Sequence, residues 1–319
     1  MVGAVRYVEK ASIASGWGRI DFEEDLKALK PDYFVVNHDG YTPDKKRLCE
    51  ENGVELIVLE RIPETGLPSR SSSSSKKELK FPYRVCLAGG WVDQPWVSEI
   101  CQGSVVVAQS WPTIGFNDRS GMATSSRRVG IELWGDQLPD GDPVRNAQLL
   151  FGAENPPGSE YISGSQDHIG LLVPGISRLD YNGRFWPQHI ENIRDAETCE
   201  WLSEVLHFAP LQPRPEGYNP VSEKNLTREL VKRLGESGKN CFEAIQKKDV
   251  KLLGESMKET FLCWSEMLPH TVPGWVMDEM QANYFPRYSG AITSGSGGGY
   301  IVFPSEETVE GTLKIKVKY

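Results

Sequence analysis

The first eighty residues alternate short apolar runs with polar stretches of helical length. Between residues 21 and 30, Phe22, Leu26 and Leu29 fall on one helical face. A polar stretch that begins at a proline and ends before Gly53 is typical of a second helix. The expected elements are a helix at 21–30, a buried strand at 33–36, a helix at 43–52 and a strand at 54–59. Alternating helices and strands predict parallel α/β packing.

From Arg84 onward, small and apolar residues form short strands that glycine-rich loops interrupt. Residues 224–268 form a helical pair, whose apolar side chains recur at three- and four-residue steps and are expected in the core. This stripe comprises Phe242, Ile245, Leu253, Met257, Phe261 and Trp264. Further expected elements are a helix at 125–134 and strands at 300–303 and 313–317. Strands and helices in separate runs predict an α+β fold with two layers in each half.

Composition narrows the class of protein. The chain has 319 residues, 25% of them charged, which is ordinary for a globular protein. A net charge of −9 argues against a nucleic-acid surface, and no apolar run is long enough to span a membrane. The six cysteines include no C-x-x-C pair, so we expect small apolar residues in a reducing compartment, which fits a cytoplasmic enzyme. The sequence leaves the oligomeric state open, a homo-oligomer included.

The candidate chemistry lies in four segments that are rich in glycine and serine. They are FPYRVCLAGGWVDQP at 81–95, SGMATSSRR at 120–128, SGSQDHIG at 163–170 and AITSGSGGGYIVF at 291–303. Loops without bulky side chains let backbone N–H groups approach a polyanion, and nearby hydroxyls can hold a metal. An acid among them can accept a proton from a substrate hydroxyl. Together they indicate phosphoryl transfer from a nucleotide to a small alcohol.

In their order, these motifs resemble the GHMP small-molecule kinases, especially the branch that acts on heptose and fucose. The first segment resembles that branch's "P-R-aliphatic-G-G-x-x-D-x-P" opening, the third its "G-x-Q-D" segment, and the last its "T-G-x-G-G-G" loop. The resemblance covers roughly residues 80–319 and implies ATP and Mg²⁺ as cofactors and a sugar or polyol as substrate. It also implies two halves, a ribosomal S5 domain 2-like half at 79–215 and a ferredoxin-like half at 216–319.

The resemblance gives Asp167 the role of general base and places Arg84 near the reacting hydroxyl and this base. Asp93, with Gln166 and the backbone of Gly89 and Gly90, would then bind the sugar. Each residue also has a plain structural interpretation. Asp167 suits a helix N-cap or a turn, Arg84 and Asp93 could form a structural ion pair, and the two glycines could serve a tight turn.

The nucleotide would bind at the second and last segments. The residues concerned are Gly121, Thr124, Ser125, Ser126, Gly295, Gly297 and Gly298. The family's "G-L-G-S-S-S-A" becomes G-M-A-T-S-S-R here, so Ala123 replaces a glycine and Arg127 either contacts phosphate or caps the helix. Fewer than thirty residues separate Asp93 from this loop, less than in the family. We therefore expect a remodelled or weaker adenine site.

Two residues are candidates for holding Mg²⁺. Ser125 offers a hydroxyl, and Glu154 lies where many relatives have a metal-binding glutamate, although a loop acid near prolines is also typical of a solvated side chain. His168, next to Asp167, is expected to pack or to form a hydrogen bond rather than to act as a second base.

Residues 1–78 resemble the closing half of a cytidylyltransferase-like nucleotidyltransferase, a Rossmann-like α/β domain. The resemblance lies in LKPDYFVVNHDGYTPDKKRLCEENGVELIVLERIP and LPSRSSSSSKKEL. Ser71, Ser72, Ser73 and Lys76 then either face phosphate at a helix start or form a flexible linker. The family's H-x-G-H pair is absent, so the chain is expected to begin partway through the domain and to lack nucleotidyl transfer.

Three functional hypotheses follow. The first is a GHMP-type sugar or polyol kinase from a bifunctional protein whose nucleotidyltransferase makes an activated nucleotide sugar. The second is a regulatory domain that binds a nucleotide or a sugar phosphate without turnover, which Ala123 and the shortened segment favour and which Asp167, Arg84 and Asp93 oppose. In the third, the nucleotidyltransferase is the only active part of the parent protein.

Overall fold

The computed structural model describes residues 20, 22–59, 81–111, 116, 120–135, 137–211 and 219–319. The chain divides into two compact units, residues 1–77 and 78–319. The serine-rich segment with Ser71, Ser72, Ser73 and Lys76, and the boundary expected between residues 215 and 216, lie outside the described residues.

The N-terminal unit contains a two-stranded parallel sheet, as the alternation of helix and strand predicts. The elements follow one another as α1 (Glu23–Leu29), β1 (Tyr33–Asn37), a short 3₁₀ turn η2 (His38–Gly40), α2 (Pro43–Glu51) and β2 (Glu55–Leu59). Strands β1 and β2 pair in parallel, and η2 and α2 connect them. Thr42 caps α2 through its side chain, and Gly53 ends it with a positive φ of 69°. A small core holds Leu26, Leu48, Cys49 and Val54.

The expectation that residues 33–36 form a buried strand is wrong. Alternate side chains of β1 are exposed, Tyr33 by 58% and Val35 by 51%. Among the described residues this sheet has two strands. Phe34 packs against the small core of this unit and stacks on Phe22, while the side chains on either side of it face outward. Leu29 is also 69% exposed rather than on the buried face, because α1 ends there and Lys30 turns left-handed at φ 41°.

The second unit contains a five-stranded antiparallel sheet. Its strands are β3 (Tyr83–Ala88), β4 (Gly103–Trp111), β5 (Ile176–Tyr181), β6 (His189–Ile193) and β10 (Lys316–Val317). The long strand β4 pairs with β3, β5 and β10, and β6 extends the sheet from β5. The strand expected at 313–317 is shorter than predicted, since Leu313 forms only an isolated bridge to Phe208.

A second, three-stranded sheet has the order β7-β9-β8, again antiparallel. Its strands are β7 (Leu206–Pro210), β8 (Ile292–Gly295) and β9 (Gly298–Pro304). The predicted strand at 300–303 is therefore confirmed as part of β9. The turn between β8 and β9 is the last glycine-rich segment, so this sheet carries one wall of the candidate site.

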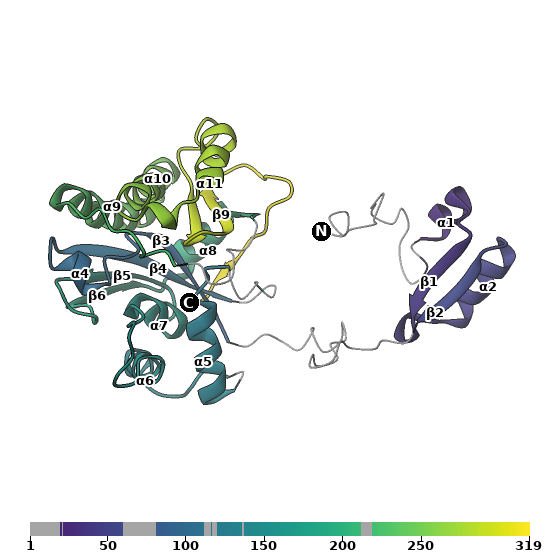
Figure 1. Ribbon diagram of the computed structural model, residues 1–319, viewed down its shortest axis with the longest axis horizontal. Coiled ribbons are helices and arrows are strands. Elements are labelled where there is room, and N and C mark those ends of the chain that lie inside the picture. The colour runs from purple at the N-terminus through teal and green to yellow at the C-terminus, as the bar shows by residue number, and fades with distance from the viewer. Residues whose placement is uncertain are drawn as a thin grey trace. The chain divides into compact units, whose positions relative to one another are not determined.

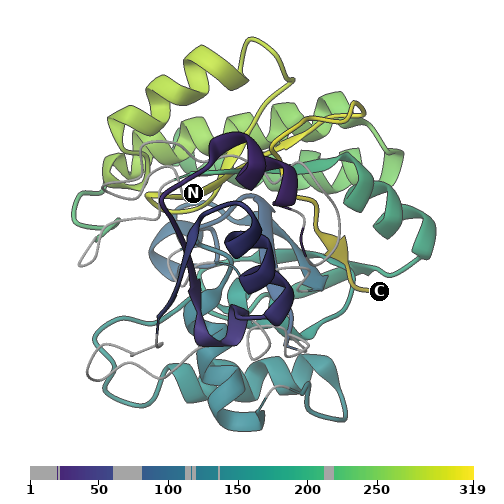
Figure 2. The ribbon, with the colours of Figure 1, turned by 90° about the vertical axis from the view of Figure 1, so that its right-hand side faces the viewer.

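Helices cover the five-stranded sheet on both sides. The first set is α5 (Thr124–Trp134), α6 (Pro143–Glu154) and α7 (Ser165–Leu172), and the second is α9 (Arg228–Lys247) and α10 (Val250–Met267). Figure 1 shows α9 and α10 above the sheet and α5, α6 and α7 below it, and Figure 2 shows the same layers from the side. The remaining elements are α4 (Pro95–Ser98), α8 (Ala196–Val205), η3 (Pro269–Thr271), α11 (Gly274–Glu279) and the π-turn η4 (Met280–Tyr284). The predicted helix at 125–134 and the helical pair are confirmed.

The apolar stripe of the helical pair lies in the core, as predicted. Leu253, Met257 and Phe261 are fully buried, and Trp264 is 4% exposed. All six cysteines are unpaired and five of them are buried, which confirms their expected role as small apolar residues. No helix in the described part of the chain is long and apolar enough to cross a bilayer. Mixed α+β architecture is confirmed.

Candidate active site

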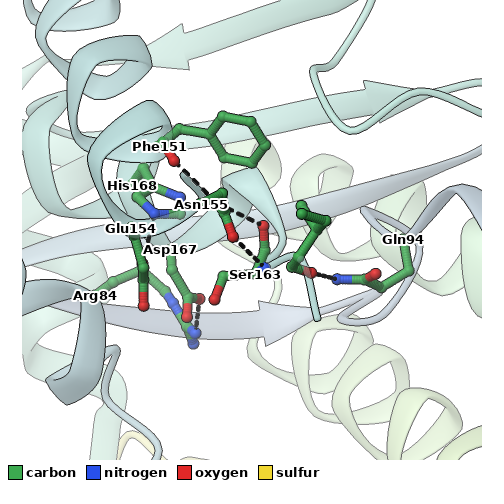
Figure 3. Close-up of polar contacts among 9 residues, drawn as sticks. Arg84, Gln94, Phe151, Glu154, Asn155, Ser163, Asp167 and His168 are labelled. Atoms are coloured by element: carbon green, nitrogen blue, oxygen red, sulfur yellow. Dashed lines mark hydrogen bonds and ion pairs between the residues drawn. The ribbon is translucent and has the colours of Figure 1, made fainter. Parts of the chain in front are cut away.

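Arg84 and Asp167 form an ion pair at the centre of the candidate site. Arg84 lies on β3 and is 7% exposed, and its Nη2 donates to Oδ1 of Asp167 in the first turn of α7 (Figure 3). Gly170, one turn further along α7, packs so closely on the Arg84 side chain that any Cβ there would collide with it. The N-cap of α7 is Gly164. The alternatives of an N-cap Asp167 and of an Arg84–Asp93 ion pair are therefore wrong.

Asp93 lies next to this pair but has a different partner. Its carboxylate is 1% exposed and its Oδ1 accepts a hydrogen bond of 2.9 Å from Nε2 of Gln166. The pKa of Asp93 is raised to about 7, mainly by burial and also by the nearby charge of Asp167, and Arg84 partly offsets both. Gly164 leaves room for the Asp93 carboxylate, because a Cβ on residue 164 would overlap it.

The loop that carries Asp93 is held by α10. Oγ1 of Thr260 accepts a hydrogen bond of 3.0 Å from the N–H of Gly89, and Nε1 of Trp264 donates one of 2.9 Å to the carbonyl of Gly90. Gly89 has a φ of 74° and lies against the Ser104 backbone, so this position requires glycine. The tight-turn interpretation is therefore correct for Gly89.

The second and last glycine segments pack against each other. Gly121, with a φ of 73°, lies so close to Gly295 of β8 that a Cβ on either residue would strike the other's Cα. The Ser294 hydroxyl donates to the Ser120 carbonyl and accepts a 3.0 Å hydrogen bond from the N–H of Tyr300. Two segments about 170 residues apart thus form one surface.

Helix α5 begins on this surface at an N-cap residue, Ala123, that cannot cap it with its own side chain. Its N-cap, Ala123, has a left-handed conformation with a φ of 55°, and no side chain of its own caps the first turn. Thr124 and the exposed Ser125 follow directly. The first N–H groups of such a helix favour an anion. Arg127 points elsewhere: its guanidinium donates to the Phe81 carbonyl.

Glu154 and His168 form a buried pair that links α6 to α7 (Figure 3). Nε2 of His168 lies 2.6 Å from Oε2 of Glu154, and the two side chains are 0% and 12% exposed. Burial by itself would raise the pKa of Glu154, but His168, followed by Ser126 and Ser163, lowers it below its ordinary value. The buried Ser126 hydroxyl meets no partner at hydrogen-bond geometry, although it lies near enough to affect Glu154.

Asn155, which the sequence did not single out, anchors the segment that leads into α7. Its Oδ1 accepts a hydrogen bond of 2.7 Å from the N–H of Ser163, and its Nδ2 donates one of 2.9 Å to the Phe151 carbonyl (Figure 3). Nearby, Nε2 of Gln94 donates to the Ile162 carbonyl at 3.3 Å. Asn at a helix C-cap after an apolar run is a recognisable signal, but it predicts a helix end and not this partner.

A cavity of about 450 Å³ joins these groups. The predicted catalytic and substrate residues that line it are Arg84, Gly90, Asp93, Gln166 and Asp167. The predicted nucleotide residues that line it are Gly121, Thr124, Ser125 and Gly295. Five predicted residues do not line it, namely Gly89, Ser126, Glu154, Gly297 and Gly298. Gly297 instead donates to the Thr271 carbonyl at 2.9 Å, and Gly298 pairs with Gly295 at the β8–β9 turn.

Comparison with known proteins supports the fold through structure alone. No protein-family model matches the chain, and no curated protein sequence matches it. The Methanococcus jannaschii mevalonate kinase is similar with a TM-score of 0.51 and 13% identity, over 75% of this chain and 97% of that one. The Lactococcus lactis galactokinase, complexed with galactose, has a TM-score of 0.51 and 11% identity over 77% and 95%.

A further match is a D-glycero-D-manno-heptose 1-phosphate kinase from Bacteriodes thetaiotaomicron, with a TM-score of 0.47 and 14% identity over 75% of this chain and 96% of that one. The structural neighbours are thus GHMP-family kinases, and the mixed α+β fold is consistent with theirs. The cytidylyltransferase-like interpretation of residues 1–78 stays a prediction.

Proposed function

We propose that this protein transfers the γ-phosphoryl group of ATP to a hydroxyl of a sugar or polyol, with Asp167 as general base. The observation that carries the proposal is the buried Arg84–Asp167 pair, which lines one cavity together with Ser125 at the start of α5. An acid, a cation and a helix N-terminus around one space are parts that phosphoryl transfer requires. The kinase fold of the neighbours agrees by analogy.

In the proposed reaction the substrate hydroxyl loses its proton to an Asp167 carboxylate oxygen as its oxygen bonds to the γ-phosphorus. The bond between that phosphorus and the bridging oxygen of ADP breaks, ADP leaves with the electron pair, and the proton later passes from Asp167 to water. Arg84 orients the Asp167 carboxylate through their ion pair and offsets negative charge on the transferring group.

The residues at α5 fit the phosphates of a nucleotide. Ala123 provides no side-chain cap, and Gly121 and Gly295 line the cavity without side chains. Mg²⁺, when bound, would offset the charge of the phosphates, and in such sites one or two protein oxygens suffice. Ser125 would supply a ligand. Glu154 is the second candidate, and its bond to His168 would then orient it.

The sugar subsite in this proposal lies around Asp93. The Gln166 amide holds the Asp93 carboxylate in place, and α10 holds the loop of Gly89 and Gly90. Carboxylate oxygens accept hydrogen bonds from hydroxyl groups, which suits a carbohydrate. We infer that this loop orients the acceptor hydroxyl toward Asp167.

Replacement of the general base tests the proposal. Asp167→Asn keeps the size of the side chain and removes its basicity, so kcat should fall by about two to four orders of magnitude. Asp142→Asn, an exposed N-cap at which asparagine caps equally well, is the matched control and should keep kcat unchanged. If Asp167→Asn folds and retains nearly the full kcat, Asp167 is not the base.

One observation favours the second candidate, a domain that binds a nucleotide without turnover. Ala123 occupies a left-handed position where the family motif has a glycine, and this backbone conformation disfavours a side chain. A nucleotide that binds by calorimetry without phosphorylation of any sugar, in wild type and in Ala123→Gly alike, would support this second function and refute the kinase proposal.

We propose that the N-terminal unit is part of a cytidylyltransferase-like domain in a bifunctional cytoplasmic protein, which would make an activated nucleotide sugar from the kinase product. The parallel pairing of β1 and β2 around α2 supports this origin. Formation of a CDP- or ADP-sugar by this chain alone, from sugar phosphate and CTP or ATP, would contradict the expectation that the unit lacks nucleotidyl transfer.

A further inference from the structure

We propose that the cavity selects an uncharged, polyhydroxylated substrate and rejects sugar phosphates and sugar acids. The inference rests on the proposed kinase function and narrows its substrate class. It follows from the sign of the charges that line the cavity.

Three of the described residues that line the cavity are charged, Arg84, Asp93 and Asp167. Arg84 is the cation among them, and its guanidinium is already paired with Asp167. Above about pH 7, where Asp93 is ionised, the formal charge of this lining is therefore negative before any ligand binds. A phosphate or carboxylate on the substrate would lie beside Asp93 and Asp167, and like charges placed together in a partly dry site repel strongly.

Neighbouring cations among the described residues are engaged outside the cavity. The Arg127 guanidinium donates to the Phe81 carbonyl at 2.9 and 3.1 Å and lies 4.3 Å from the Tyr83 ring centroid. The ammonium group of Lys224 lies 4.1 Å from the ring centroid of Trp96. Neither residue lines the cavity.

The hydrogen-bonding character of the site favours hydroxyl groups. Ionised carboxylates only accept hydrogen bonds, so above about pH 7 both Asp93 and Asp167 need donors from their ligand. A sugar hydroxyl can donate, whereas an ionised phosphate or carboxylate can only accept. Asp93 is 1% exposed and receives one side-chain donor, Nε2 of Gln166, which leaves acceptor capacity for the substrate.

The uncharged part of the wall suits a sugar ring. Trp91 and Trp264 line it together with the amides of Gln94 and Asn219. Aromatic rings pack against the C–H faces of a pyranose, and amides both donate to and accept from its hydroxyls. The Gln94 side chain is held between the Trp96 indole N–H at 3.2 Å and the Ile162 carbonyl, so its orientation is set before substrate binds.

Matched pairs of ligands test the inference on the full chain. Each pair consists of a neutral pyranose and its 1-phosphate or its uronic acid. Both members are measured at about pH 8, where Asp93 is ionised, by calorimetry with a non-hydrolysable Mg·ATP analogue and by steady-state phosphorylation with Mg·ATP. We expect at least about tenfold higher affinity and kcat/KM for the neutral member. If the charged member has the higher affinity and kcat/KM in the pairs that bind, the inference is wrong and the kinase proposal remains intact.

The two readouts separate this inference from the proposed function. Neutral sugars that bind more tightly than their charged partners without being phosphorylated would support the inference and refute the kinase proposal. If no member of any pair binds or reacts, both are wrong.

Two variants locate the source of the selectivity. Asp93→Asn keeps the acceptor for Gln166 and removes one carboxylate charge, so the preference for the neutral ligand should shrink several-fold in this variant. Asp142→Asn removes a carboxylate that does not line the cavity and should leave the preference unchanged. Equal preferences in wild type and Asp93→Asn would show that cavity charge does not set the substrate class.

Discussion

The buried carboxyl of Asp93 makes the stability of the protein depend on pH in a way that Asp93→Asn should remove. Burial, aided by the charge of Asp167 and opposed by Arg84, raises the pKa of Asp93 from 3.8 to about 7. Folded protein therefore keeps a proton that the unfolded chain releases. The contribution of Asp93 to the unfolding free energy is fully present below the ordinary pKa of an aspartate, and it is lost as pH rises toward about 7.

The size of the effect follows from this pKa. Between about pH 5 and about pH 7, each pH unit reduces the unfolding free energy by about 1.4 kcal/mol, so the loss by about pH 8 is about 3 kcal/mol. Asparagine does not titrate and keeps the acceptor for Gln166. The unfolding free energy of Asp93→Asn, relative to wild type, should therefore increase by about 3 kcal/mol between these limits.

Urea unfolding of both proteins across this pH range gives the measurement. Tryptophan fluorescence reports mainly the second unit, because eight of the nine tryptophans lie in residues 78–319. Two stability profiles that run parallel, or a difference that shrinks as pH rises, would refute the reasoning about Asp93.

A second pair of variants tests the stated cause. In an Asp167→Asn background the neighbouring negative charge is gone and Arg84 loses its partner, so both changes favour the ionised Asp93. The pH-dependent difference caused by Asp93→Asn should then become smaller. An unchanged difference would mean that Asp167 does not contribute to the raised pKa of Asp93.

Three further predictions concern the loops. Trp264→Phe removes the indole N–H that holds the Gly90 carbonyl. KM for the sugar should rise about fivefold, as for one lost hydrogen bond, with little change in kcat, and an unchanged KM would contradict this. Gly295→Ala should abolish Mg·ATP binding in calorimetry because its Cβ meets Gly121, whereas Gly152→Ala, with open space around it, should bind normally. Ala123→Gly should raise the unfolding free energy by about 1 kcal/mol in urea titrations, and a loss of stability would show that its backbone is not strained.

The sequence predicted the surface made by the glycine-rich loops because their motifs follow a family's order and contain residues without side chains. Gly121 and Gly295 were assigned to one nucleotide site by family resemblance, and in the structure each excludes a side chain on the other. Helical periodicity likewise placed Leu253, Met257 and Phe261 in the core. Both signals depend on the properties of single residues or on regular spacing, which a sequence contains directly.

Partners between distant elements could not be predicted in this way. The residues alone left open whether Arg84 pairs with Asp93 or, as the family resemblance implied, lies near Asp167, and the structure pairs it with Asp167 because α7 packs on β3. Trp264 was expected in the core, but it also lines the cavity and holds Gly90, 174 residues away in sequence. The exposed face of β1 was missed because an apolar run does not show how many layers cover it.

Transfer of phosphate label tests the central claim most directly. The full chain is incubated with Mg²⁺ and ATP radiolabelled at the γ-phosphate, together with a panel of neutral sugars and polyols, and the products are separated. The proposed function predicts label in a sugar phosphate ester for at least one acceptor, with the yield in Asp167→Asn lower by about two to four orders of magnitude. Label that stays in ATP or appears only as inorganic phosphate with every acceptor would contradict the account.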